Sequence, residues 1–212
     1  MSAPESTPGL TLPAQSAFGG LPVATGSGRG VVASERAGLD AVRLVARTDG
    51  VAALAERIQS AFGLELPAGP VRVEGRIAGD AGKPIALIGI GVDAWLAVAD
   101  AGSGDLLDLL RQSVGPLAAL TDQGGGMAVL RLTGPQVRAA LAKLLPIDLH
   151  PRALAVGAAA STVAAYIAVT LWRLPDSGAG NAVFEIAVGR SYAVSFREAL
   201  ACCAAEFGFT RE

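Results

Sequence analysis

Apolar and polar positions along the chain repeat with two different periods. Residues 71–79 (VRVEGRIAG) alternate between apolar and polar side chains, which predicts a strand with one buried face. Residues 51–62 instead carry one apolar side chain per helical turn, which predicts a helix that ends at Gly63. We expect Thr48 or Asp49 to cap the start of this helix. Its apolar stripe consists of Val51, Leu54, Ile58 and Phe62.

Three more helices are predicted from the same helical spacing. The first begins at Asp105 and ends at Gly115, the second has Pro135 at its first position, and the third is capped by Ser191. Their apolar faces comprise, in chain order, Leu106, Leu109, Leu110 and Val114; Val137, Ala140, Leu141 and Leu144; and Tyr192, Phe196, Leu200, Cys203 and Phe207.

Strands are predicted between these helices. A strand within residues 31–48 precedes the first helix, and residues 84–100 and 116–134 each contain two apolar runs joined by a turn, which is typical of hairpins. A long buried strand is expected to run to Leu174, and residues 183–189 (VFEIAVG) form another. This order, without strict strand–helix alternation, predicts an α+β fold of mainly antiparallel sheets with helices packed outside.

The first 30 residues differ in composition from the rest of the chain. They are rich in Pro, Ser, Thr and Gly, and they lack the basic start and apolar core of a secretory signal. We expect residues 1–30 to form an arm without a packed core, either flexible or bound along a partner. Residues 31–212 are expected to form a single α+β domain, with two intertwined subdomains as an alternative.

The chain is apolar for a protein of 212 residues, with 51% hydrophobic and 17% charged residues. Such a composition indicates either a membrane protein or one that buries surface against a partner. Residues 153–172 carry no charge and are long enough to span a bilayer. However, Ala, Gly, Ser and Thr make up much of this run, and residues 162–171 favour a strand. We therefore expect no membrane association and a cytoplasmic location.

Few residues offer chemistry of their own. The net charge is −2 and no basic run is present, so nucleic-acid binding is not expected. A zinc site needs three or four converging ligands, but the chain has one histidine and the adjacent pair Cys202 and Cys203. The two cysteines are expected to be small buried hydrophobes on a helix. The glycine-rich stretches at 26–30 and 89–95 lack the strand–turn–helix context of a phosphate site.

The single histidine, His150, lies in the sequence PIDLHP between two prolines, two residues after Asp148. A general base requires an orienting partner within a cleft, and His150 would have to complete every candidate catalytic set in the chain. A structural histidine that hydrogen-bonds to the local backbone is the favoured interpretation. We expect Asp148 and His150 to fix a rigid corner or to present it to a partner.

Four stretches follow one another at natural spacing over residues 85–208. They are IGVDAWLAV (90–98), LRLTGPQVRAALAKLLPIDLHP (130–151), STVAAYIAVTLWR (161–173) and VGRSYAVSFREALACCAAEFG (188–208). Together this series resembles the gamma subunit of heterotetrameric sarcosine oxidase. That subunit is itself related to the folate-binding domain of the glycine-cleavage aminomethyltransferases, which implies the same α+β fold.

The resemblance implies a non-catalytic gamma subunit within a four-chain flavin-dependent oxidase. The complex would demethylate sarcosine to glycine, reduce oxygen to hydrogen peroxide and pass the one-carbon unit to tetrahydrofolate. The implied FAD, FMN, NAD, zinc and tetrahydrofolate would sit on the other subunits, and the implied partners are the alpha, beta and delta subunits. No catalytic, cofactor-binding or metal-binding residue is then expected on this chain. The candidate structural or partner-interface residues are Asp148, His150, Arg190 and Trp172.

Two alternatives stay open at this point. The substrate of the complex could be another N-methyl amino acid, such as dimethylglycine or N-methylglutamate. The chain could also be a stand-alone, folate-binding protein that resembles the aminomethyltransferases. Those relatives often carry Asp-x-Ser on the strand before the Gly-Pro unit, whereas here Asp122 is followed by Gly124 in the place of serine. This departure weighs against folate binding by this chain.

Overall fold

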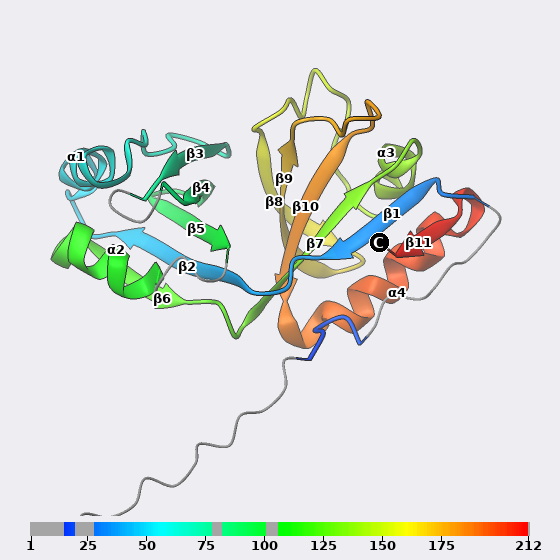
Figure 1. The fold of residues 1–212 in the computed structure, drawn as a ribbon, viewed down its shortest axis with the longest axis horizontal. Coiled ribbons are helices and arrows are strands. Elements are labelled where there is room, and N and C mark those ends of the chain that lie inside the picture. The colour runs from blue at the N-terminus through cyan, green and yellow to red at the C-terminus, as the bar shows by residue number, and fades with distance from the viewer. Residues whose placement is uncertain (1–14, 20–27, 78–81, 101–105, 212) are drawn as a thin grey trace, which may run out of the picture.

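The computed structural model describes residues 15–19, 28–77, 82–100 and 106–211 (Figure 1). They form two sheets, each covered on one face by helices. The five-stranded sheet has the order β3 (Arg72–Arg76), β4 (Pro84–Gly91), β5 (Ala94–Asp100), β2 (Leu39–Ala46) and β6 (Ala118–Asp122). Its helices are α1 (Val51–Phe62) and α2 (Leu106–Val114).

The six-stranded sheet contains most of the second half of the chain. Its order is β11 (Phe209–Arg211), β1 (Val31–Glu35), β7 (Met127–Thr133), β10 (Val183–Gly189), β9 (Ile167–Leu174) and β8 (Ala159–Ala164). Its helices are α3 (Val137–Ala142) and α4 (Ala193–Ala204). Within the described residues, neighbouring strands of both sheets are antiparallel except β1 and β11, which are parallel. The predicted α+β class with mainly antiparallel sheets is confirmed.

In the sequence, the strands of the five-stranded sheet come between the first and second strands of the six-stranded sheet. β1 belongs to the six-stranded sheet, β2 to β6 build the other sheet, and β7 returns to the first. The chain therefore crosses between the sheets at residues 36–38 and again at 123–126. Both crossings lie at the junction of the two halves in Figure 1.

The inner strands β4, β5, β7 and β10 bury side chains on both of their faces, whereas the edge strands β3, β6 and β8 keep exposed residues. On β10, Phe184, Ile186 and Val188 contact the α3 and α4 side, whereas Ala187 belongs to a cluster between the two sheets. We call that cluster the joining cluster. It consists of Ala41, Ala86, Ile88, Leu96, Val98, Val129, Ala159, Trp172 and Ala187. The order of layers is thus helices, sheet, sheet and helices, because both sheets also bury a face against their neighbour.

The helix at 51–62 and its end at Gly63 are confirmed, and Gly63 adopts a left-handed φ of 63°. Three predicted helix starts are wrong. Gly50 precedes α1 without any side-chain cap, Gln136 rather than Pro135 precedes α3, and Tyr192 rather than Ser191 precedes α4. At α4 a 3₁₀ turn over Arg190–Tyr192 leads into the helix and takes the place of the serine cap.

The predicted long strand up to Leu174 is instead a hairpin. β8 and β9 pair in antiparallel fashion around a two-residue turn at Ala165 and Tyr166. Both turn residues have positive φ, 47° and 68°, as a type I′ turn requires. An Ala-Tyr pair is not a typical turn sequence, so the pattern gave no sign of this break. The single strand expected within 31–48 is likewise two strands, β1 and β2, in different sheets. The hairpin expected within 116–134 is also wrong, because its two strands, β6 and β7, belong to different sheets.

The described part of the N-terminal arm contacts the body of the protein. Phe18 is fully buried against the core on the α4 side, and its carbonyl accepts a hydrogen bond from Arg197 Nη1 at 2.8 Å. The backbone N–H of Ala17 donates to Glu35 Oε1 at 2.9 Å. Residues 15–19 therefore depart from the expectation of an arm that lacks packing on its own chain. The prediction for residues 1–14 and 20–27 lies outside the described residues.

The uncharged run at 153–172 forms a turn and most of the β8–β9 hairpin. In the part of the chain that the structure describes, no helix combines the length and apolar character needed to cross a membrane. The expectation for the cysteines is wrong in part. Cys202 is exposed and Cys203 is half-buried, and this burial raises the pKa of the Cys203 thiol despite the nearby Lys143.

Candidate functional site

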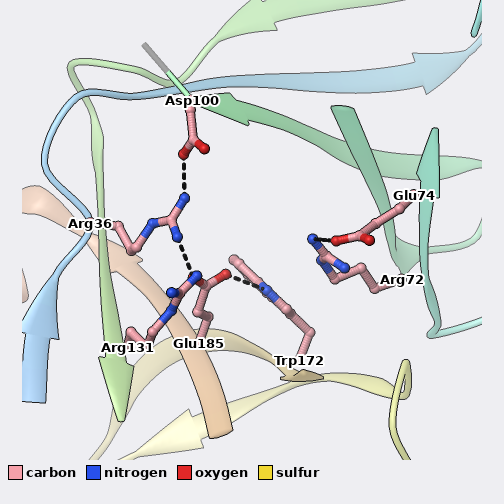
Figure 2. A network of polar contacts seen from close by, with 7 residues as sticks. All are labelled: Arg36, Arg72, Glu74, Asp100, Arg131, Trp172 and Glu185. Carbon is pink, nitrogen blue, oxygen red and sulfur yellow. Dashed lines mark hydrogen bonds and ion pairs between the residues drawn. The ribbon is translucent and has the colours of Figure 1, made fainter. Parts of the chain in front are cut away.

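A group of charged side chains lies beside the joining cluster, between the two sheets (Figure 2). Its centre is the carboxylate of Glu185 on β10, which is only 5% exposed. We call Arg36, Asp100, Arg131, Trp172 and Glu185 the inter-sheet network. Because a buried carboxylate is costly unless it is paired and hydrogen-bonded, its partners decide whether the site is stable.

The partners of Glu185 are divided between the two oxygens of its carboxylate. Oε1 accepts from Arg131 Nε at 3.0 Å and from Arg131 Nη2 at 2.7 Å, and Arg36 Nη1 lies 3.3 Å from the same atom. Oε2 accepts from the indole Nε1 of Trp172 at 2.8 Å. Both oxygens of the carboxylate are therefore satisfied by groups of this chain.

Sheet register explains why these three side chains meet. Glu185 on β10 is directly opposite Arg131 on β7 and directly opposite Trp172 on β9. Direct cross-strand neighbours have Cβ atoms close enough to interact on one face of a sheet. The strand alternation that points Ala187 toward the joining cluster also points Glu185 there. Three adjacent strands thus build the core of the network.

Arg36 extends the network from one sheet to the other. It lies on the first crossing between the sheets, where its backbone N–H donates to the carbonyl of Val129 on β7 at 2.9 Å. One nitrogen of its guanidinium pairs with Glu185 of the six-stranded sheet, and the other pairs with Asp100 at the end of β5. Arg36 therefore ties the two sheets together at this position.

A cavity of about 280 Å³ adjoins the network. Arg72 and Glu74 on β3 also line it, and they form an ion pair with each other. The charged groups around the cavity are three guanidinium groups and three carboxylates, so the formal charges cancel. Among the described residues, Arg72 Nε is buried and has no hydrogen-bond partner. The arrangement stabilises its own charges and presents no surplus charge to a ligand.

Of the residues singled out from the sequence, Trp172 lies in the network and is completely buried. Asp148 and His150 are exposed in the loop after α3. Asp148 Oδ1 accepts from the backbone N–H of His150 at 2.8 Å, and His150 Nδ1 accepts from that of Arg152 at 3.2 Å. These are local backbone hydrogen bonds of the kind expected for His150. A contact of this corner with a partner stays a prediction.

Arg190 is exposed at the end of β10, and its Nη2 donates to the carbonyl of Gln15 at 2.8 Å. It therefore holds the described part of the arm against the body of the protein. No hydrogen bond or ion pair among the described residues joins Asp148, His150 or Arg190 to the inter-sheet network. Over the same residues, no group of three His, Cys, Asp or Glu side chains is placed to hold a metal ion.

Sequence reasoning missed four members of the network, Arg36, Asp100, Arg131 and Glu185. A signal was present for two of them. Arg131 and Glu185 are each the only charged residue in a strongly apolar strand, MAVLRLT and VFEIAVG. A lone charge in a strand buried on both faces indicates a buried partner of opposite sign.

Residues 47–206 match the model of the sarcosine oxidase gamma subunit family. The chain belongs to this family. It is 39% identical over 132 residues to a sarcosine oxidase subunit gamma of Arthrobacter sp, and 36% identical over 132 residues to one of Corynebacterium sp. (strain P-1). Each alignment covers 62% of this chain and 61% of the relative, so the chain spans about three fifths of each relative's length in the alignment.

Solved structures resemble the fold over more of the chain. A chain of the heterotetrameric sarcosine oxidase from Corynebacterium sp. U-96, solved in complex with pyrrole 2-carboxylate, superposes with a TM-score of 0.68. The two are 29% identical, and the match covers 86% of this chain and 88% of that one. The glycine cleavage aminomethyltransferase T of Bartonella henselae gives a TM-score of 0.66 at 16% identity, covering 87% of this chain and 48% of that one. At that identity the second likeness shows the fold alone, and it confirms the expected aminomethyltransferase-like architecture.

Proposed function

We propose that this chain is the non-catalytic gamma subunit of a heterotetrameric, flavin-dependent sarcosine oxidase. The observation that carries the proposal is family membership over residues 47–206, together with the fold likeness to a chain of such a tetramer over 86% of this chain. The complex would convert sarcosine to glycine with reduction of oxygen to hydrogen peroxide and transfer of the one-carbon unit to tetrahydrofolate.

The geometry of the inter-sheet network supports a structural role for this chain. Glu185 has both oxygens occupied by Arg131, Arg36 and Trp172. A general acid or base must be able to reach a substrate proton, which a fully paired buried carboxylate cannot do without breaking its own pairs. In the proposed complex FAD, FMN, NAD, zinc and tetrahydrofolate are carried by the alpha, beta and delta subunits.

Co-expression with the alpha, beta and delta subunits tests this proposal. A tag on this chain is expected to recover three further chains in equal amounts, with the visible absorbance of bound flavin and sarcosine-dependent formation of hydrogen peroxide. Expression of the other three subunits without this chain is the matched control, and it is expected to give less intact complex. A colourless chain that is recovered alone from the four-subunit expression would contradict the proposal.

A binding experiment on the isolated chain separates this function from a stand-alone folate-binding protein. The isolated chain is titrated with tetrahydrofolate, and no binding is expected because Gly124 replaces the serine of the Asp-x-Ser pattern. In the structure the backbone N–H of Gly124 donates to Asp122 Oδ1 at 2.8 Å, which engages one oxygen of that carboxylate within its own turn. Saturable tetrahydrofolate binding by the isolated chain would favour the stand-alone alternative.

A further inference from the structure

The two sheets end in four edge strands, and β8 differs from the other three in charge. Natural sheets protect their edges with charged side chains or by keeping the edge strand very short. The other edges follow this rule, since β3 and β6 carry charges and β11 has three residues. Their charged residues are Arg72, Glu74 and Arg76 on β3, Asp122 on β6 and Arg211 on β11. β8, with the sequence AASTVA, has no charge, proline or glycine.

The outer side of β8 offers free backbone groups at Ser161 and Val163. With a two-residue turn, the backbone N–H and C=O groups of Ala164 and Thr162 form hydrogen bonds with β9. The backbone groups of the alternate residues, Val163 and Ser161, then point away from β9. Ala159 confirms this alternation of inward and outward backbone groups, because its N–H donates outward to the carbonyl of Pro70 at 2.8 Å. Beyond that contact, no described residue pairs with the outward backbone groups of Ser161 and Val163. The Ser161 hydroxyl donates to the carbonyl of Ile90 on β4 at 3.2 Å, so it is the backbone of β8 that stays open from Ser161 to the hairpin tip.

A cavity of about 800 Å³ lies beside residues 159–161 of this edge, and a second of about 590 Å³ lies over the face of β8, β9 and β10 and reaches the edge at residues 161–163. They share Ile90 and Ser161, so they adjoin one another beside β8. Their linings are mostly apolar or small, and Arg43 and Asp93 are the charged residues among them. An extended segment that pairs with β8 would find room for uncharged side chains on this side.

The tip of the hairpin displays an aromatic side chain at a conformational cost. Tyr166 is completely exposed, and both it and Ala165 have positive φ, which is unfavourable for residues with a Cβ atom. Val163 and Val92 are also exposed, by 46% and 92%. Strained turns that hold a large apolar side chain in water are typical of binding surfaces. Tyrosine is among the residues that contribute most to protein interfaces.

We propose that the open edge of β8 binds an extended, uncharged segment of a neighbouring subunit by β-strand addition. The new strand would pair with the backbone of Ser161 and Val163 and would pack against Tyr166. The absence of charge along β8 favours an uncharged segment, because a charged side chain packed against this strand would have no oppositely charged neighbour on it. This inference rests on the proposed function, since the occupant is another subunit of the tetramer.

Amide hydrogen exchange of the full-length chain, alone and within the purified four-subunit complex, tests the inference directly. The amides of Ser161 and Val163 are expected to exchange at least about tenfold more slowly in the complex, as they gain hydrogen bonds. The amide of Thr162 already bonds to β9, so it is expected to change little and serves as the internal control.

Three outcomes would overturn the inference. If the wild-type chain does not enter a complex, the proposed function fails and the inference fails with it. If the complex forms but Ser161 and Val163 exchange as fast as in the isolated chain, only the inference fails. If the isolated chain is a dimer in sedimentation analysis with these amides already protected, the edge belongs to a second copy of this chain.

A matched pair of variants provides an independent readout. Val163→Lys places a charge on the open edge, while Val194→Lys changes a valine of similar exposure, 41%, on α4. Val163→Lys is expected to lower the affinity of the chain for its partners at least about tenfold, with unchanged thermal unfolding of the isolated chain. Val194→Lys is expected to change the affinity less than about twofold. Equal effects of the two variants would contradict the inference.

Discussion

The two sides of the joining cluster differ in how the sheets meet. On one side, Arg36 links Asp100 of the five-stranded sheet to Glu185 of the six-stranded sheet, and Trp172 and Arg131 complete the pairing. On the other side, further along β10, Val188 and Gly189 line a cavity of about 590 Å³ that reaches the free edge of β8. Ala187 of the joining cluster lies between the two regions.

This difference separates two roles within one fold. The charged side is complete, because its buried carboxylate has partners for both oxygens within this chain. The uncharged side is incomplete, because backbone groups and a tyrosine are exposed to water with no described partner. Variants on the charged side are therefore expected to change folding stability, and variants on the uncharged side are expected to change assembly.

The largest effect is expected from Glu185→Ala. This change leaves the Arg131 and Arg36 guanidinium groups and the Trp172 indole without their common acceptor. We expect the free energy of unfolding of the isolated chain to fall by about 3 kcal/mol at neutral pH, because removing one member of a buried ion pair leaves the other charges without a partner. Urea denaturation measures the loss.

Glu206→Ala is the control for that variant, since Glu206 pairs with Lys143 at the surface. An exposed ion pair contributes little, so a loss below about 1 kcal/mol is expected. Similar losses for the two variants would show that the buried network contributes no more to stability than an exposed ion pair.

A smaller effect is expected from Trp172→Phe, and Trp95→Phe is its matched control. Both tryptophans are buried and donate at 2.8 Å, Trp172 to the Glu185 carboxylate and Trp95 to the carbonyl of Pro67. The change in volume is the same, so the difference reports on the acceptor. Hydrogen bonds to charged groups are stronger, so Trp172→Phe is expected to cost about 1 kcal/mol more in urea denaturation. Equal costs would contradict a role for the Glu185 charge.

On the uncharged side, Tyr166→Gly is expected to separate stability from assembly. Glycine adopts positive φ without steric cost, so the free energy of unfolding of the isolated chain is expected to rise by about 0.5 kcal/mol. Affinity for the partner subunits, measured by titration of labelled chain, is expected to fall about tenfold. Tyr192→Ala, at an exposed tyrosine before α4, serves as the control for assembly. A Tyr166→Gly chain that assembles like the wild type would place the interface elsewhere.

Local patterns predicted much of the fold from the sequence. The apolar stripe of Val51 to Phe62 and the paired apolar runs of residues 84–100 fixed α1 and the β4–β5 hairpin, because both depend on near neighbours. The turn at Ala165 and Tyr166 was missed because neither residue usually adopts positive φ, and the pairing of β8 with β9 imposes it.

The network was harder to predict, because its members are far apart in the sequence. Glu185 meets Arg131 across 54 residues, and Arg36 meets Asp100 across 64. Only the strand order places them together, and the order of strands does not follow from periodicity. The available signal was that Arg131 and Glu185 are each the only charge in an apolar strand. Such a charge indicates that a buried partner exists, but it does not identify the partner.

The central claim is that the inter-sheet network stabilises the subunit while the reaction takes place on other chains. Glu185→Gln, which keeps the size of the side chain but removes its charge, tests this most directly in the purified four-subunit complex. The account predicts a kcat per bound flavin within about twofold of the wild type, together with a lower melting temperature of the isolated variant chain. A complex that assembles and unfolds like the wild type, but loses about a hundredfold or more in kcat, would contradict it.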